Sequence, residues 1–246
     1  HKIKKPIYKN IKSTLKDELE EIIDYDTFSE SYNGWGAYSL TKSLNVNTCP
    51  YCNRAYSHTH VSENGRTRAP LDHFMPKSDY AYLALSLYNL VPSCQVCNSS
   101  FKGGKDLFMM DHIYPYEEHF GMDARFDIDL CADKDGKYSI PLVSGVNAKE
   151  NFNVILKINS SSSIKAKIEN SNDTFHIEEI YQYHKDYVLE ILRKLVYYNQ
   201  TKIDELLNDN VFVGLFESRA ELIQTLFGNY LEEQHLSKRV LSKLTK

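Results

Sequence analysis

The chain has 246 residues, enough for one large domain or two small ones, and its 42% hydrophobic and 25% charged residues are ordinary for a globular protein. No apolar run approaches the ~20 residues of a membrane span, and no apolar signal-peptide segment follows His1–Lys5, so we expect a cytoplasmic protein without a membrane partner. The net charge of −4 argues against nucleic-acid binding by bulk charge alone.

The first half of the chain opens with a predicted helix over residues 11–24, where leucines and isoleucines recur at helical spacing. The sequence Asn33–Gly36 then breaks the pattern. Further on, Glu63–Arg66 is typical of a β-hairpin turn, and we expect the second strand of that hairpin to end at Asp72-His73. A short helix is expected to begin at Cys97-Asn98.

The second half changes from strands to helices. Short alternating or β-branched segments, separated by Asp, Gly and Asn, predict strands at 125–130, 138–143 and 153–158. From about residue 176 the apolar residues keep to one helical face for several turns, and a second helix is expected from about residue 217.

Four of the five cysteines form two pairs, Cys49-Pro-Tyr-Cys52 and Cys94-Gln-Val-Cys97. An odd number of cysteines without a secretion signal argues against a disulfide framework. Two Cys-x-x-Cys turns supply four thiolates for a closed, structural zinc ion. A single such turn could instead be a redox dithiol, but a redox dithiol does not require a second Cys-x-x-Cys pair elsewhere in the chain. Cys131 stands apart and is expected to be a buried small hydrophobe.

Positive charge gathers between the cysteine pairs. Residues 49–105 contain six Lys or Arg and three acids, a local charge of +3, which leaves −7 for the rest of the chain. This distribution suits a protein that contacts phosphates at one place, although chance fluctuation would also produce it.

The same region carries residues suited to phosphodiester hydrolysis. It reads Arg68-Ala-Pro-Leu-Asp72-His73-Phe-Met-Pro76-Lys77-Ser78, then Leu87-Tyr88-Asn89-Leu90-Val91-Pro92-Ser93, with Asn98 directly after the second cysteine pair. Hydrolysis needs an activated water and a cation on the phosphoryl oxygens. His73 has the pKa range of a base, whereas Asp72 and Asn98 offer oxygen ligands that suit Mg²⁺ or Mn²⁺.

This pattern resembles the HNH (ββα-metal) endonuclease family over about residues 49–105. His73, preceded by Asp72, matches the first position of the motif, Asn89 the middle and Asn98 the third, an HNN variant. The resemblance implies that Asn89 holds the backbone and orients His73. The longer sequence from Asp72 to Asn98 looks like that of the PtuB-type nucleases of Septu and retron anti-phage systems. This resemblance implies a PtuA-type ATPase as a partner and, in retrons, a reverse transcriptase with its nucleic acid.

Each residue also has a plainer interpretation. An Asp-His dipeptide is usually a surface pair, an isolated Asn89 a turn residue and an isolated Asn98 a helix cap; their joint placement between four cysteines favours a site. Three basic residues are candidate phosphate contacts, against the default of a solvated side chain: Arg54, Lys102 and Lys105. The dipeptide Asp111-His112 lacks this frame and is expected either to support the site residues from behind or to serve packing.

We therefore expect an α+β protein with a zinc-stapled ββα-metal core. Residues 1–48 would form a helical N-terminal extension, 49–115 the nuclease core, and 116–246 a region of strands and then helices. Its helical part, from about 176, would either dock a protein partner or complete the core.

The expected function is a metal-dependent HNH endonuclease, the DNA-cleaving effector of an anti-phage system. One alternative is an effector of the same type that cleaves tRNA or other RNA, since the attacking water needs no 2′-hydroxyl group. Another is a non-catalytic, zinc-stapled nucleic-acid-binding module, which would not need Asp72, His73, Asn89 and Asn98 at this spacing.

Overall fold

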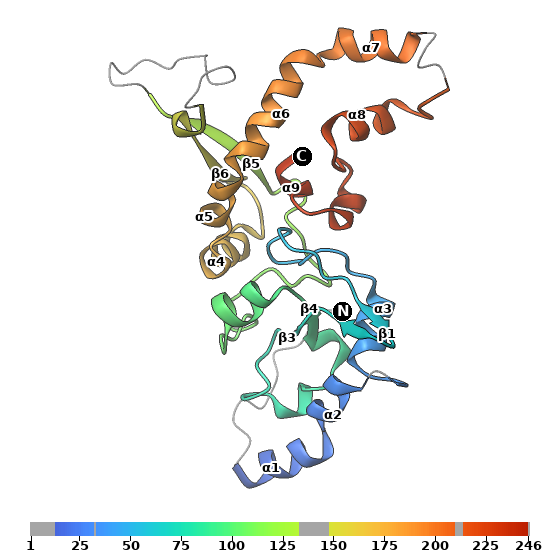
Figure 1. The fold of residues 1–246 in the computed structure, drawn as a ribbon. Helices are drawn as coiled ribbons and strands as arrows, with labels where there is room; N and C mark the ends of the chain where they lie inside the picture. The colour runs from blue at the N-terminus through green and yellow to red at the C-terminus, as the bar shows by residue number, and fades with distance from the viewer. Residues whose placement is uncertain (1–12, 32, 133–147, 210–213, 246) are drawn as a thin grey trace. The chain divides into compact units, whose positions relative to one another are not determined.

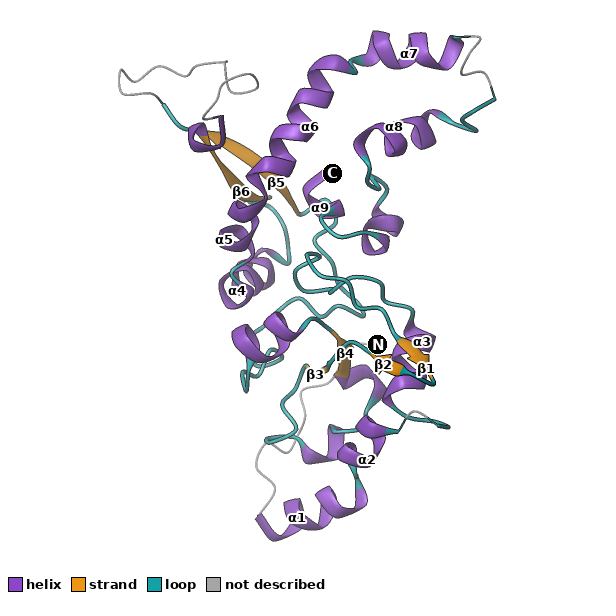
Figure 2. Ribbon diagram, viewed as in Figure 1, coloured by secondary structure: helices purple, strands orange, loops and turns teal. Residues whose placement is uncertain are grey.

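The computed structural model describes residues 13–31, 33–132, 148–209 and 214–245. Both helices and short strands occur along them (Figures 1 and 2), which confirms the predicted α+β class. The helices are α1 (Ser13–Ile22), α2 (Tyr25–Glu30), α3 (Ala37–Leu44), α4 (Lys165–Phe175), α5 (Ile177–Tyr181), α6 (Lys185–Tyr197), α7 (Gln200–Asn208), α8 (Arg219–Phe227) and α9 (Ser242–Thr245). The strands are β1 (His60–Ser62), β2 (Gly65–Thr67), β3 (Leu71–His73), β4 (Leu90–Pro92), β5 (Ala124–Leu130) and β6 (Phe152–Ile158).

Short helical turns complete the described elements. They are η1 (Ala81–Leu83), η2 (Leu87–Asn89), η3 (Val96–Lys102), η5 (Ala148–Asn151), η6 (Gln182–His184) and η7 (Glu233–Lys238). All are 3₁₀ turns except η3, which is a π-helix. The helix expected to begin at Cys97-Asn98 is therefore confirmed, one residue earlier than expected.

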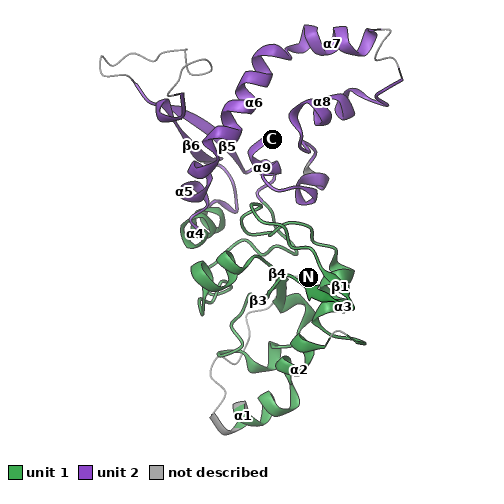
Figure 3. Cartoon of the chain, viewed as in Figure 1, with its two compact units in different colours: residues 1–119, 166–175 green, residues 120–165, 176–246 purple. Residues whose placement is uncertain are grey.

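The chain divides into two compact units, coloured separately in Figure 3. Unit 1 comprises residues 1–119 together with 166–175, and unit 2 comprises 120–165 together with 176–246. All residues of the predicted site fall in unit 1.

Unit 1 contains two separate pairs of antiparallel strands. The hairpin predicted at Glu63–Arg66 is confirmed, because β1 pairs with β2 around it. The expectation that Asp72-His73 ends this hairpin is wrong: both residues lie on β3, which pairs with β4 so that His73 faces Leu90. The reason is burial, since every residue of β1 and β2 is exposed whereas β3 and β4 are almost wholly buried.

The small apolar core of unit 1 holds β3 and β4 in place. Leu71 and Leu90 on the two strands pack with Ala37 and Leu40 of α3, and all four are buried. Partly buried side chains from the N-terminal helices surround them: Tyr25, Phe28 and Leu44. The helical N-terminal segment thus supports the strand that carries His73.

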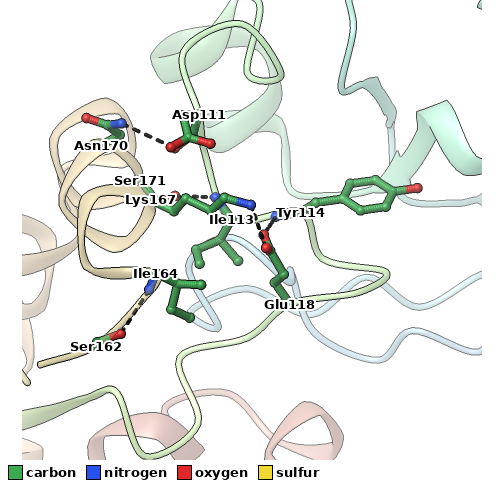
Figure 4. Close-up of polar contacts among 9 residues, drawn as sticks. All are labelled: Asp111, Ile113, Tyr114, Glu118, Ser162, Ile164, Lys167, Asn170 and Ser171. Atoms are coloured by element: carbon green, nitrogen blue, oxygen red, sulfur yellow. Dashed lines mark hydrogen bonds and ion pairs between the residues drawn. The ribbon is translucent and has the colours of Figure 1, made fainter. Parts of the chain in front are cut away.

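Helix α4 belongs to unit 1 although it lies far along the chain. Figure 4 shows its polar side chains holding the segment 110–118. The Nζ atom of Lys167 lies 2.5 Å from Glu118, Asn170 donates to the carbonyl of Asp111 at 3.2 Å, and Ser171 accepts the amide of Ile113 at 3.0 Å. The helix is rich in Asn, Ser and Asp and buries few apolar residues, so it lacks the periodic apolar face that would have predicted it.

Unit 2 is built on the antiparallel pair β5–β6, which confirms the strands expected at 125–130 and 153–158. The strand expected at 138–143 lies outside the described residues. The long helical region predicted from residue 176 is present but interrupted by η6, where the Gln182 side chain bonds both backbone groups of Val154 on β6. Helix α8 confirms the helix expected from about 217, whereas α7 was not predicted.

Candidate metal centre and active site

Four cysteine side chains converge in unit 1. The sulfur atoms of Cys49, Cys52, Cys94 and Cys97 all lie within 4.8 Å of one another, and those of Cys52 and Cys94 are 3.9 Å apart. A tetrahedral zinc ion with Zn–S bonds of about 2.3 Å holds its sulfurs about 3.8 Å apart. The cluster therefore fits such an ion, and the four free thiols could hold a metal ion such as zinc.

The backbone of each Cys-x-x-Cys turn is arranged for a charged sulfur. The amide of Arg54 donates to Cys52 Sγ and that of Cys97 to Cys94 Sγ, both at 3.4 Å. Burial raises the pKa of the Cys49 thiol well above its usual range, so a thiolate there needs a compensating cation. Four thiolates fill a tetrahedral coordination sphere, which leaves no open position for chemistry.

His73 lies at the end of β3, half-buried, with its ring in a fixed orientation. Its Nε2 atom is 3.0 Å from the carbonyl oxygen of Ala84, and the ring of Tyr25 meets it edge-on with centroids 4.6 Å apart. A carbonyl oxygen can only accept, so Nε2 carries the proton in this contact and Nδ1 keeps its lone pair. Burial lowers the pKa of His73 to about 4, and the imidazole is neutral at neutral pH.

Asn89 clamps the backbone that follows His73. Its Oδ1 atom accepts the amide of Met75 at 2.7 Å, and its Nδ2 group donates to the carbonyl of Met75 at 2.9 Å and to that of Leu83 at 3.2 Å. Its own carbonyl accepts the amide of Phe74 at 3.0 Å. The side chain is buried, so these bonds bring together the segment after His73 and the turn that supplies Ala84.

Asp72 points to a different environment, as expected for neighbouring residues on a strand. The hydroxyl of Tyr51 donates to its Oδ2 atom at 2.6 Å, and Lys102 Nζ lies 2.9 Å from Oδ1. The Asp72 and Lys102 side chains are only 1% and 2% exposed. Burial raises the pKa of Asp72 while the charge of Lys102 opposes that shift. Asp72 thus links the first cysteine turn, β3 and η3.

The predicted divalent-cation site is not open in this arrangement. A cation on Asp72 would have to displace either the Tyr51 hydroxyl or the Lys102 ammonium, and a buried ammonium beside Oδ1 repels it. The residues around Asp72 therefore do not fit Mg²⁺ or Mn²⁺ as they stand. Asn98, the other predicted ligand, is half-buried on η3, and its side-chain amide makes no hydrogen bond to any residue that the structure describes.

The basic residues predicted to contact phosphate have different surroundings. Lys102 does not face solvent, because its ammonium pairs with Asp72 and both side chains are buried. Lys105 is exposed just beyond η3, and Arg54 is half-buried after the first cysteine turn. The structure thus leaves Lys105 at the surface and puts Lys102 inside.

Two further predictions concern residues outside this frame. His112 is buried with its Nε2 atom 2.8 Å from Thr174 Oγ1 on α4, which is a packing position, whereas Asp111 is exposed. The prediction that Cys131 is buried is wrong. It directly follows β5 and is exposed; its backbone amide donates to the carbonyl of Asn151 at the end of η5, and its sulfur lies 3.7 Å from Asn153 on β6.

The fold brings three groups to the site that were not expected from the sequence: the Tyr51 hydroxyl, the Tyr25 ring and the Ala84 carbonyl. Tyr51 is 21 residues from Asp72 in sequence. Its place between two cysteines was the one available signal. A backbone carbonyl carries no sequence signal at all.

The chain finds no match among models of protein families, among curated proteins or among solved structures. No helix in the described ranges is both long and apolar enough to span a bilayer. Fold and site together define a mixed α+β protein with a four-cysteine group that could hold a metal ion and, in the same unit, a half-buried histidine whose ring has a fixed orientation.

Proposed function

We propose that unit 1 is a nuclease of the HNH type, which hydrolyses phosphodiester bonds of nucleic acid with His73 as the general base and a structural zinc ion on the four cysteines. The observation that carries the proposal is the orientation of His73. The bond from Nε2 to the Ala84 carbonyl selects the tautomer in which Nδ1 can accept a proton.

The order of the surrounding elements supports the same proposal. Strand β3, its antiparallel partner β4 and the helix η3 follow one another, with the cysteines of the second turn at the start of that helix. A strand–strand–helix unit with a histidine on its first strand and an asparagine on its helix is what the ββα-metal resemblance implies.

The proposed step needs two proton transfers and one displacement. Nδ1 of His73 takes a proton from a water molecule while the water oxygen forms a bond to phosphorus. The bond from phosphorus to the leaving sugar oxygen breaks, and that oxygen takes a proton from solvent water to become a hydroxyl group. The negative phosphate favours the imidazolium that forms. A divalent ion would supply positive charge to the phosphoryl oxygens when bound. Asn98 retains an amide oxygen for it, whereas Asp72 is engaged by Lys102.

The proposed substrate is DNA, with tRNA as the alternative. The proposed setting is an anti-phage system with a PtuA-type ATPase and, in a retron, a reverse transcriptase with its nucleic acid. These assignments rest on the resemblance of residues 72–98 alone.

The test is cleavage of plasmid DNA and of total tRNA by the purified protein, with Mg²⁺, Mn²⁺ or a chelator, and with and without the ATPase. His73→Ala should lower the rate about 10²–10⁴-fold, because the base is lost. His235→Ala, a partly exposed histidine of unit 2, is the matched control and should leave the rate unchanged. A fully active His73→Ala protein would show that the base lies elsewhere.

The burial of Asp72 favours a second candidate, a non-catalytic nucleic-acid-binding module. An acid that is 1% exposed and bonded to Tyr51 and Lys102 is typical of a structural role. Binding of DNA or tRNA without cleavage under every metal condition, and with the ATPase present, would select this candidate.

A further inference from the structure

Hydrolysis at His73 requires a positive group near the scissile phosphate, and Lys102, one of the three basic residues predicted to contact phosphate, is buried. Lys102 Nζ is engaged with Asp72 and does not reach solvent. The following inference rests on the proposed function and identifies the residue that holds the substrate beside His73.

Lys77 and His73 both contact the ring of Tyr25, and Lys77 is exposed. Its ammonium is 4.7 Å from the centre of the Tyr25 ring, whose centre is in turn 4.6 Å from that of the His73 ring. The side chain is 50% exposed. The charge of Lys77 also contributes, after burial, to the low pKa of His73, which agrees with this proximity.

These distances match the reach of a hydrolytic site. A base holds its water at about 3 Å, the water oxygen approaches phosphorus to about 3–3.5 Å, and a lysine bonds a phosphoryl oxygen at about 2.8 Å. A lysine that binds the attacked phosphate therefore lies within about 10 Å of the base. The ammonium of Lys77 can be no farther from the centre of the His73 ring than its two ring distances combined.

The present partners of Lys77 can be exchanged for a phosphate. Its acidic neighbour Asp26 is 3.7 Å away and 87% exposed, and an ion pair of that kind contributes little. The Tyr25 ring attracts the ammonium without neutralising it. Lys77 therefore keeps its charge for a ligand.

We propose that Lys77 binds the substrate phosphate that is attacked by the water molecule activated by His73. Lys77 is then the substrate-contacting cation of the site, and Asp26 is a weak competitor for it. The ring of Tyr25 holds the histidine and the lysine at the required separation.

The experiment measures binding of a fluorescein-labelled DNA duplex and of labelled tRNA by anisotropy, over a range of salt concentrations, in a His73→Ala background that prevents cleavage. Lys77→Met should weaken binding about tenfold and reduce the salt dependence on DNA by about 0.9 in log–log slope, the value of one phosphate contact. Lys77→Arg keeps the charge and should restore most of the affinity.

The matched control is Lys149→Met in unit 2. Lys149 is 58% exposed and lies 3.9 Å from Asp186, a surface pair like that of Lys77 and Asp26. Its variant should bind as the parent does. Asp26→Asn, which removes the competitor, should bind slightly more tightly than the parent.

Equal affinity and equal salt slope for Lys77→Met and its parent would overturn the inference, as would absence of binding by the parent. Failure of the proposed function looks different, because it is the absence of cleavage by the unsubstituted protein. Weakened binding by Lys77→Met in a protein that never cleaves would keep the phosphate contact and reject the nuclease.

Discussion

Asn89 holds the backbone segment that follows His73, because its side-chain amide bonds both backbone groups of Met75. Asn89→Ala would leave the buried amide and carbonyl of Met75 without partners, at about 1–3 kcal/mol for each group. We expect the free energy of unfolding to fall by at least about 2 kcal/mol and kcat to fall although His73 is present.

Urea denaturation and steady-state kinetics measure these two effects. Asn208→Ala is the matched control, since Asn208 is an exposed asparagine of α7 whose amide also donates to a backbone carbonyl. Its variant should lose little stability and no activity. If Asn89→Ala proved as stable as the control variant, the clamp would not hold the segment as described.

At the scale of elements, the buried pair of Asp72 and Lys102 joins β3 to η3, and Tyr51 adds the first cysteine turn. Lys102→Met leaves an unpaired buried carboxylate, which costs about 3–5 kcal/mol, whereas removing both charges in Asp72→Asn with Lys102→Met should cost much less. A double-mutant cycle of unfolding free energies measures the coupling. Additive costs would mean that the two charges do not interact in the folded protein.

His112 lies where segment 107–113 packs against α4, and its burial should make the stability of the protein depend on pH. Burial lowers the pKa of His112 below its usual 6.5, so the unfolded chain binds a proton that the folded protein resists. Stability is then fully present above about pH 6.5 and is lost as the pH falls toward the folded pKa, by at most about 1.4 kcal/mol per pH unit.

Urea titrations between about pH 7.5 and 5.5 measure this slope. His73 contributes with the same sign, because its folded pKa is about 4, so the contribution of His112 is the difference between the parent and His112→Gln. That variant should show the shallower slope. An identical slope in both proteins would mean that His112 is not buried in its neutral form.

At the scale of the whole molecule, we expect the two units to differ in their dependence on metal. All four clustered cysteines lie in unit 1, whereas unit 2 contains only Cys131. Chelation of the ion should unfold unit 1, since folding and binding of a structural metal are coupled, and should leave the β5–β6 pair of unit 2 folded. Limited proteolysis with mass spectrometry locates the loss, and elemental analysis measures the zinc.

Cys97→Ser should lose zinc, and Cys131→Ser, at an exposed cysteine, is the control that should retain it. Full zinc content in the Cys97→Ser protein would contradict the four-cysteine site. Protection of unit 1 from protease after complete chelation would show that the ion does not support its fold.

The sequence by itself determined those features that depend on spacing along the chain. Each Cys-x-x-Cys turn is a local structure that supplies two sulfur ligands, and a structural zinc ion needs four, so the two turns are expected to share one ion. The turn at Glu63–Arg66, strands β5 and β6 and helix α8 likewise follow from local residue patterns. Helix α4 was not predicted, because its contacts to segment 110–118 are polar and join residues that are distant in sequence.

Only the tertiary structure decided which partners the site residues have. Asp72 and His73 are adjacent in sequence, yet one is bonded to Tyr51 and Lys102 inside the unit and the other reaches Tyr25 and the Ala84 carbonyl. Lys102 and Lys77 look alike as surface lysines in the sequence, but one is buried and the other exposed. Burial and pairing depend on which strands meet in the fold, and a local pattern carries no record of that.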